Sequence, residues 1–274
     1  MTRITNRQIR KKKRYIFILR RVVFFSLLIL VVFSLISAIL NIRIPKTVNV
    51  PLELPEKSNN PLFIPTPTPT KKTTVLIYHT HNDEAYYKGN KNYFESDKGR
   101  TFNEKYNVIA VGEALKKELE RYNFNVIHDK SDNVSDGFNY AYDTSLKNIK
   151  KYIEKADIFI DLHRDAYATG TNKNYISGSL GKEYAFIKFV VANGKKYNER
   201  PNYTQNKYLA EKIDIELNKL LPEISKGIME KDARLNQHIS ESCLLIEIGN
   251  EKNDIEQVIN STEILASAIY KTIE

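Results

Sequence analysis

The chain has 274 residues, of which 42% are hydrophobic and 27% are charged, and this balance excludes both a disordered chain and a membrane protein with many spans. Its net charge of +9 would ordinarily favour a nucleic-acid partner. However, residues 1–21 contain nine basic residues and no acidic residue, so the remainder holds 33 basic and 33 acidic residues. The excess charge belongs to a basic N-terminal tail, and nucleic acid is not the predicted partner.

An uncharged segment of nineteen residues, 22–40, follows the basic tail. About 20 apolar residues cross the hydrocarbon core as a helix, so residues 22–42 are predicted to form one transmembrane anchor. Basic flanks stay in the cytoplasm, which predicts a single-pass protein of the cell membrane with residues 1–21 inside and the rest extracytoplasmic. A cleaved signal peptide is the alternative, but neither Ser37 nor Ala38 completes the small-x-small pattern of a cleavage site.

A proline-rich segment precedes the remaining sequence. Seven of the nine prolines lie between residues 45 and 69, and proline favours extended polyproline II over packed structure, so residues 43–73 are predicted to be a linker. Residues 74–274 then form one predicted domain. Its lone cysteine, Cys243, cannot make an intrachain disulfide and lies beside an apolar run, which predicts a packed thiol rather than a nucleophile.

Segments with strand and helix patterns alternate from residue 74 onward. Short β-branched-rich runs predict strands at 75–80, 125–128, 157–163 and 244–249. Apolar residues at helical spacing predict helices around 108–119, 146–153, 203–221 and 255–269, the last opened by a capping box between Asn253 and Glu256. Residues 175–193 favour a hairpin or an added strand. This order predicts an α/β domain with a mixed, largely parallel sheet flanked by helices.

Metal-binding residue types gather where predicted strands end, which is where ligands bind in open α/β sheets. The first strand ends in a segment with His79, His81 and Glu84, and the third ends in one with Asp161 and His163. Because alternate strand residues share a face, we expect His79 beside His81, and Asp161 beside His163. A histidine from each of two strands plus a carboxylate is the ligand set of a catalytic zinc site.

Glu247 lies inside the otherwise apolar run 244–249. Burying a carboxylate is costly unless it is paired or serves a site. As a general base it would take a proton from water and deliver it to a leaving amine. Pairing with a lysine or with backbone donors is the structural alternative, and the residue types alone do not decide between the two.

Four segments occur in one order across nearly all of residues 75–274: HTHNDEAY (79–86), DLHRDA (161–166), FVVANGKKYNERPNYTQNKYLAEKI (189–213) and LLIEIGN (244–250). Together they resemble the stage II sporulation protein P family of membrane-anchored N-acetylmuramoyl-L-alanine amidases. The resemblance implies Zn²⁺-dependent cleavage of the amide between N-acetylmuramic acid and L-alanine in peptidoglycan. It also implies engulfment at the forespore septum as the setting and stage II sporulation proteins D and M as partners.

The same resemblance implies a zinc site in residues 74–274. His81 and His163 would be two of the zinc ligands. Glu84 would be the third, since it matches the acid of the first family motif, whereas Glu104 is the alternative because related zinc amidases have a glutamate just before their first long helix. The extra histidine, His79, has no assigned role.

Glu247 corresponds to the family glutamate that activates water, and Arg164 to a residue suited to a substrate carboxylate. A salt bridge between Arg164 and Asp165 is the structural alternative. The ANG run after FVV and Asn250 depart from the family pattern, which affects the expected loops more than the metal ligands.

Two other functions compete with the amidase hypothesis. HTHNDE also fits the His-x-His signature of an amidohydrolase-type metalloenzyme, although such a site needs further histidines after later strands and only His163 is suitably placed. The third hypothesis is a non-catalytic peptidoglycan-binding scaffold.

Overall fold

The computed structural model describes residues 71–273 except 90, 96–98, 167–172 and 198–201. The predicted tail at 1–21, the anchor at 22–42 and the linker up to residue 70 therefore lie outside the described residues. Within the described part of the chain, no helix combines the length and apolar character that a membrane crossing requires.

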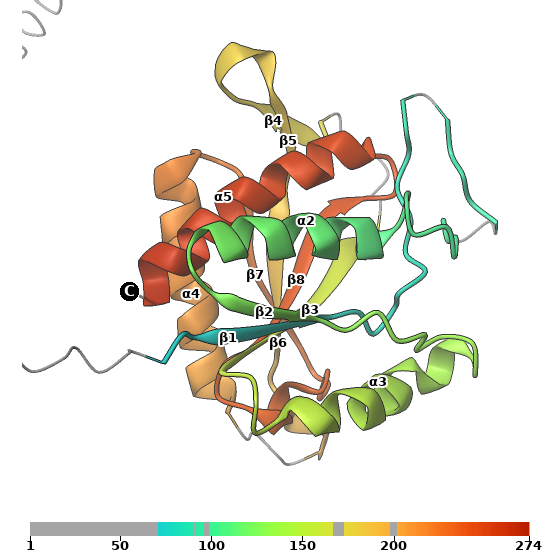
Figure 1. The fold of residues 1–274 in the computed structure, drawn as a ribbon, viewed down its shortest axis with the longest axis vertical. Helices are drawn as coiled ribbons and strands as arrows, with labels where there is room; N and C mark the ends of the chain where they lie inside the picture. Colours follow the sequence, from blue (N-terminus) through green and yellow to red (C-terminus); the bar gives the residue numbers. More distant parts are fainter. Residues whose placement is uncertain (1–70, 90, 96–98, 167–172, 198–201, 274) are drawn as a thin grey trace, which may run out of the picture. The chain divides into compact units, whose positions relative to one another are not determined.

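Strands and helices alternate along the described chain, as the apolar pattern predicts (Figure 1). The strands are β1 Thr74–Tyr78, β2 Asn125–His128, β3 Ile158–Asp165, β4 Tyr175–Ser177, β5 Glu183–Ala185, β6 Ile187–Ala192, β7 Ser225–Lys231 and β8 Cys243–Asn250. The helices are α2 Val108–Arg121, α3 Ala141–Ile149, α4 Tyr203–Leu220 and α5 Ile255–Ile273.

Six of the strands form one sheet in the order β2-β1-β3-β8-β6-β7. Strands β2, β1, β3 and β8 are parallel, whereas β6 runs antiparallel to β8 and parallel to β7. The expected α/β domain with a mixed, largely parallel sheet is confirmed. The stretch 175–193 supplies both expected alternatives, since β4 and β5 form an antiparallel hairpin and β6 adds a strand to the sheet.

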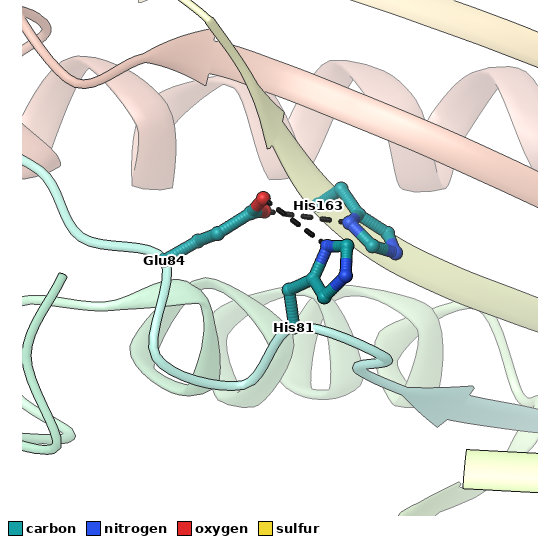
Figure 2. Close-up of side chains that lie close together, drawn as sticks. All are labelled: His81, Glu84 and His163. Atoms are coloured by element: carbon teal, nitrogen blue, oxygen red, sulfur yellow. Dashed lines mark ion pairs between the residues drawn. The ribbon is translucent and has the colours of Figure 1, made fainter. Parts of the chain in front are cut away.

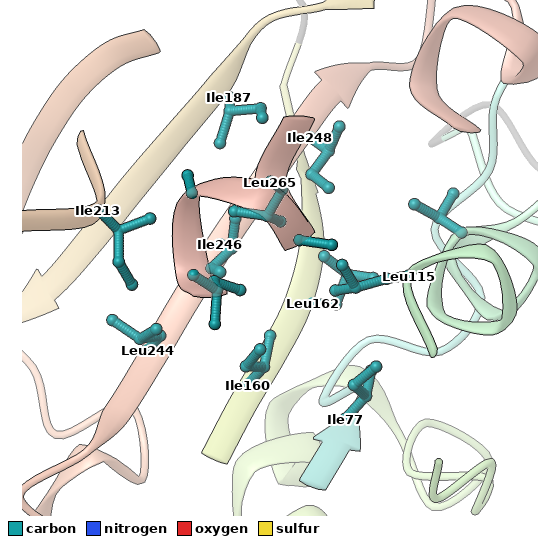
Figure 3. Close-up of a cluster of buried hydrophobic side chains, with 14 of the residues drawn as sticks. Ile77, Leu115, Ile160, Leu162, Ile187, Ile213, Leu244, Ile246, Ile248 and Leu265 are labelled. Atoms are coloured by element: carbon teal, nitrogen blue, oxygen red, sulfur yellow. The ribbon is translucent and has the colours of Figure 1, made fainter. Parts of the chain in front are cut away.

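The two faces of the sheet bury different side chains. Helices α2, α4 and α5 cover one face with a large apolar cluster, part of which Figure 3 shows, and α3 covers a smaller cluster on the other. Along β3, Ile160 and Leu162 enter the large cluster and Phe159 the small one. Because side chains alternate, Asp161 and His163 point to the α3 face. Cys243 belongs to the small cluster, as the packed thiol predicted from the sequence should.

Strand β7 is an element that the apolar pattern does not predict. Among the described strands it pairs only with β6, at one edge of the sheet, and all of its side chains are half-buried or exposed. Its sequence SKGIMEK lacks the alternation of a half-buried strand and contains Gly227 at φ 75°. Charged residues on an edge strand oppose pairing with other chains, and they also remove the apolar signal.

Helix α5 is capped one residue later than expected. Asp254 Oδ1 accepts from the N–H of Glu256 at 2.8 Å, and Gln257 Oε1 accepts from the N–H of Asp254 at 3.2 Å. Asn253 instead accepts from the N–H of Asn250 at 2.9 Å, which closes the turn after β8. The predicted box between Asn253 and Glu256 is therefore wrong, because Asp254 and Gln257 make the reciprocal pair.

Candidate metal centre

His81, Glu84 and His163 meet at the carboxyl ends of β1 and β3 (Figure 2). One ligand atom from each residue lies within 4.8 Å of the other two. Glu84 Oε1 is 3.5 Å from His81 Nδ1, and Glu84 Oε2 is 3.4 Å from His163 Nδ1. The structure thus brings together the two histidines and the first of the two carboxylates considered from the sequence. Glu104 is exposed on the loop before α2 and is not in this group.

A tight turn places His81 and Glu84 on the same side of the chain. The N–H of Glu84 donates to the carbonyl of His81 at 3.2 Å, which closes the turn directly after β1. The following loop is fastened by Ala85 N–H to the Gly99 carbonyl at 3.1 Å and by Thr101 N–H to the Asp83 carbonyl at 2.9 Å. His81 and Glu84 are three residues apart because they are the first and last residues of this hydrogen-bonded turn.

Asp161 orients the ring of His163. Asp161 Oδ1 is 2.9 Å from His163 Nε2, so His163 Nδ1 faces Glu84. The same carboxylate accepts from the Thr80 N–H at 2.9 Å and from Thr80 Oγ1 at 2.7 Å, which ties β3 to the turn after β1. A carboxylate on the outer nitrogen of a histidine is the usual arrangement around a metal ligand, because it sets the tautomer and the ring orientation.

Glu84 and His163 each stabilise the charged form of the other. Burial alone would raise the pKa of Glu84, but His163 and His81 hold it well below its usual range. Burial alone would lower the pKa of His163, but Asp161 and Glu84 raise it well above its usual value. A buried carboxylate held ionised between two imidazoles is a set of groups that a divalent cation can bridge by displacing protons.

The donor chemistry fits zinc. Two imidazole nitrogens and one carboxylate oxygen are ligands that zinc accepts, and three protein ligands leave a coordination position for a reactant. The three side chains are 5–13% exposed, so the cluster is shielded but reachable. Phe138 stacks on the His81 ring with centroids 4.3 Å apart, which fixes that ring from the other side.

Glu247 lies beside the cluster and contacts a lysine. In the sheet, Glu247 of β8 is opposite His163 of β3 and Lys188 of β6, so the three residues form one row across neighbouring strands. Lys188 Nζ is 2.5 Å from Glu247 Oε2 and 2.5 Å from Asp165 Oδ2. Burial raises the pKa of Glu247, and Lys188 partly opposes that rise. The structural alternative, pairing with a lysine, is confirmed, whereas the role of Glu247 as general base stays a prediction.

Arg164 makes contacts within the protein. Its N–H donates to Glu84 Oε2 at 2.9 Å, its guanidinium pairs with Glu251 at 3.0 Å, and it donates to the Gly99 carbonyl at 2.9 Å. The expected alternative, a salt bridge to Asp165, is wrong because Asp165 pairs with Lys188. Binding of a substrate carboxylate by Arg164 stays a prediction.

His79 does not share a face with His81, so that expectation is wrong. Strand β1 ends at Tyr78, and the chain then turns, which directs His79 toward α2. Its Nδ1 lies 2.9 Å from the Leu162 carbonyl and its Nε2 2.8 Å from His128 Nε2. Burial lowers the pKa of His79 to about 3, so the ring is neutral and structural. The two histidines therefore do not converge as the His-x-His hypothesis requires.

Sequence reasoning missed Lys188 as part of the site. It is a charged residue inside the apolar strand IKFVVA, the same signal that singled out Glu247 in LLIEIG. Thr80 was also missed, and no local pattern distinguishes its hydroxyl from an ordinary turn residue. Asp161 was placed correctly beside His163 by the alternation of β3.

Two pockets adjoin the cluster and share Ala166. The larger, of about 700 Å³, is lined by residues that include Glu84, Arg164 and the aromatic rings of Tyr87 and Phe94. The smaller, of about 210 Å³, contains Glu247 and Lys188. Glu84 of the cluster thus lines the larger pocket, and Glu247, which is opposite His163 in the sheet, lines the smaller one.

Comparison with known proteins places the chain in a family. Residues 45–270 match the family model described as Stage II sporulation protein P. The chain belongs to the stage II sporulation protein P family. The matched span, residues 45–270, contains His81, Glu84, His163 and Glu247.

A curated family member, Stage II sporulation protein P of Bacillus subtilis (strain 168), is 31% identical over 208 residues. The match covers 71% of this chain and 49% of that protein. The chain therefore matches only about half the length of this curated relative.

Similar solved structures include the N-acetylmuramoyl-L-alanine amidase from Clostridium difficile 630, with 18% identity, 74% of this chain and 96% of that chain covered, and a TM-score of 0.44. The CwlD amidase from Clostridioides difficile in complex with the GerS lipoprotein has 20% identity, the same coverage and a TM-score of 0.44. Membership of the stage II sporulation protein P family rests on the family match.

Proposed function

We propose that this chain is a zinc-dependent N-acetylmuramoyl-L-alanine amidase that hydrolyses the amide between N-acetylmuramic acid and L-alanine in peptidoglycan. The observation that carries the proposal is the pairing of a His81, Glu84 and His163 cluster with a buried carboxylate, Glu247, in the next strand. Metal-assisted amide hydrolysis needs residues that bind the metal and, next to them, a residue that transfers a proton. Family membership supports the choice of substrate.

Each residue of the site has a separate role in the proposed reaction. When bound, Zn²⁺ supplies a Lewis acid that polarises the scissile carbonyl and lowers the pKa of water to about 7. Glu247 takes the proton of the attacking water and passes it to the leaving amine. Lys188 contacts Oε2 of the same carboxylate. Asp161 keeps His163 Nδ1 facing the ligand cluster.

The setting of the reaction is also a proposal. Sporulation is named in the family description, and it favours septal peptidoglycan during engulfment as the substrate, with stage II sporulation proteins D and M as partners. The basic residues 1–21 and the apolar segment 22–40 support a membrane anchor that leaves the catalytic domain outside the cytoplasm.

Clearing of purified peptidoglycan tests the activity directly. The 274-residue chain is added to wall sacculi with a chelator, without it, and with zinc restored after chelation. Clearing that the chelator stops and zinc restores supports the proposal. Binding of sacculi without clearing favours the non-catalytic scaffold, and clearing that survives chelation contradicts the metal requirement.

A further inference from the structure

The smaller pocket carries positive charge that the proposed catalytic step does not use. Lys173 and Lys226 line it together with Lys188, against the carboxylates of Asp165 and Glu247. Lys188 contacts both of those carboxylates. In the described part of the chain, neither Lys173 nor Lys226 forms an ion pair, so two cations remain to attract an anion.

Lys226 is held in place by an aromatic ring. Its Nζ lies 3.5 Å from the centroid of the Phe186 ring, which also lines the pocket. A cation over a ring face is attracted by the ring quadrupole, and this contact limits the rotamers of a long side chain. The lysine itself is exposed, so a ligand reaches its ammonium group without displacing protein.

If the proposed function holds, the position of the general base decides which side of the scissile bond faces the smaller pocket. A general base that delivers its proton to the leaving amine must lie on the amine side of the scissile bond. Glu247 lines the smaller pocket, whereas Glu84 lines the larger one. The amine side carries the stem peptide, so the peptide extends into the smaller pocket and the sugar lies on the other side of the metal ligands.

We propose that Lys226 and Lys173 bind a carboxylate of the stem peptide, and that the smaller pocket is the subsite that selects acidic peptides. Its volume of about 210 Å³ is below that of an ordinary small-molecule site, so it holds only a small part of the peptide. Asn174 and Asn250 add amide groups to the lining for the peptide backbone. The first stem residue supplies the leaving amine, so the second is the nearest residue that can present a free carboxylate to this pocket.

Two substrates that differ only at that group test the subsite. They are muramoyl peptides whose second residue has a free or an amidated α-carboxylate, and the readout is the ratio of their kcat/KM values. The 274-residue chain should prefer the acid roughly fivefold to tenfold, the range for a partly exposed charge-assisted contact. The Lys226→Gln variant should bring the ratio closer to one, because Lys173 alone then faces the carboxylate. Lys212→Gln is the matched control, because Lys212 also lies over a ring, that of Tyr208, away from the pocket.

A binding measurement separates this inference from the proposed activity. The released stem peptide, in acid and amide forms, is titrated into the chain and followed by NMR. A preference for the acid that Lys226→Gln weakens supports the subsite even if no hydrolysis occurs, in which case the amidase proposal alone fails. Hydrolysis without any acid preference, or with a preference that Lys226→Gln leaves intact, overturns the subsite and leaves the amidase proposal standing.

Discussion

Glu247 is the residue whose chemical role can be separated from metal binding. Its carboxylate lies opposite His163 in the sheet and contacts Lys188, but it is not one of the three clustered ligands. Glu247→Gln keeps the shape and removes the base, so we expect unchanged zinc content and a fall in kcat of at least about 100-fold. Parallel measurements of bound zinc and of peptidoglycan hydrolysis check this. Normal activity in the variant would assign the base elsewhere.

Asp161 acts on the candidate metal through His163. It contacts His163 Nε2 and accepts two hydrogen bonds from Thr80. In Asp161→Asn the ring loses its anionic partner, so we expect zinc affinity to fall roughly 10-fold to 100-fold. Competition with a chromogenic chelator measures the affinity. Asp143→Asn, an exposed change in α3, is the control, and equal zinc affinity in both variants would refute the positioning role.

At the scale of elements, a neutral histidine pair lies where α2 packs on β1 and β2. Gly112 of α2 passes so close that a Cβ there would lie 2.5 Å from His128 Nε2 and 2.7 Å from His79 Nε2. Burial lowers the pKa of His128 to about 4, with Glu113 opposing and Lys130 adding to the effect. The contact between the helix and the sheet therefore depends on keeping these rings uncharged.

This dependence gives the unfolding free energy a defined pH profile. Below about pH 6.5 the unfolded chain binds a proton at His128 that the folded chain does not, so stability falls as pH drops from about 6.5 toward 4. The loss due to His128 is about 2 kcal/mol between pH 7 and pH 5. We expect His128→Gln to lose that much less over the same interval. Urea unfolding followed by tyrosine fluorescence tests it, since the chain has no tryptophan; an equal loss in both proteins would contradict it.

The sequence predicts the elements that are long apolar runs. It does not predict the features that depend on where a strand ends or on which strands are neighbours. The strands β1, β3 and β8 are buried runs, so their positions and the inward face of His163 follow from alternation. The orientation of His79 was missed because it depends on where β1 stops. The row from His163 through Glu247 to Lys188 depends on β8 and β6 being neighbours, which is a property of the strand order and not of any local pattern.

At the scale of the whole molecule, the excess of positive charge belongs to the tail and not to the domain. All of the net charge of +9 is accounted for by residues 1–21. We predict that protease added outside intact cells digests residues 74–274 and spares the tail, and that replacing the nine basic residues by glutamine disturbs this orientation. Protection of the domain in the unaltered protein would contradict the predicted topology.

The proposed amidase activity depends on which bond is broken and on whether a metal is needed. Mass spectrometry of peptidoglycan digested by the zinc-loaded 274-residue chain measures the first, and the same digestion after chelation measures the second. We predict stem peptides with a free N-terminal L-alanine and glycan strands with a free lactyl carboxylate, formed only with metal. Intact muramoyl-alanine bonds in the zinc-loaded digest, or the same products after chelation, would contradict the account.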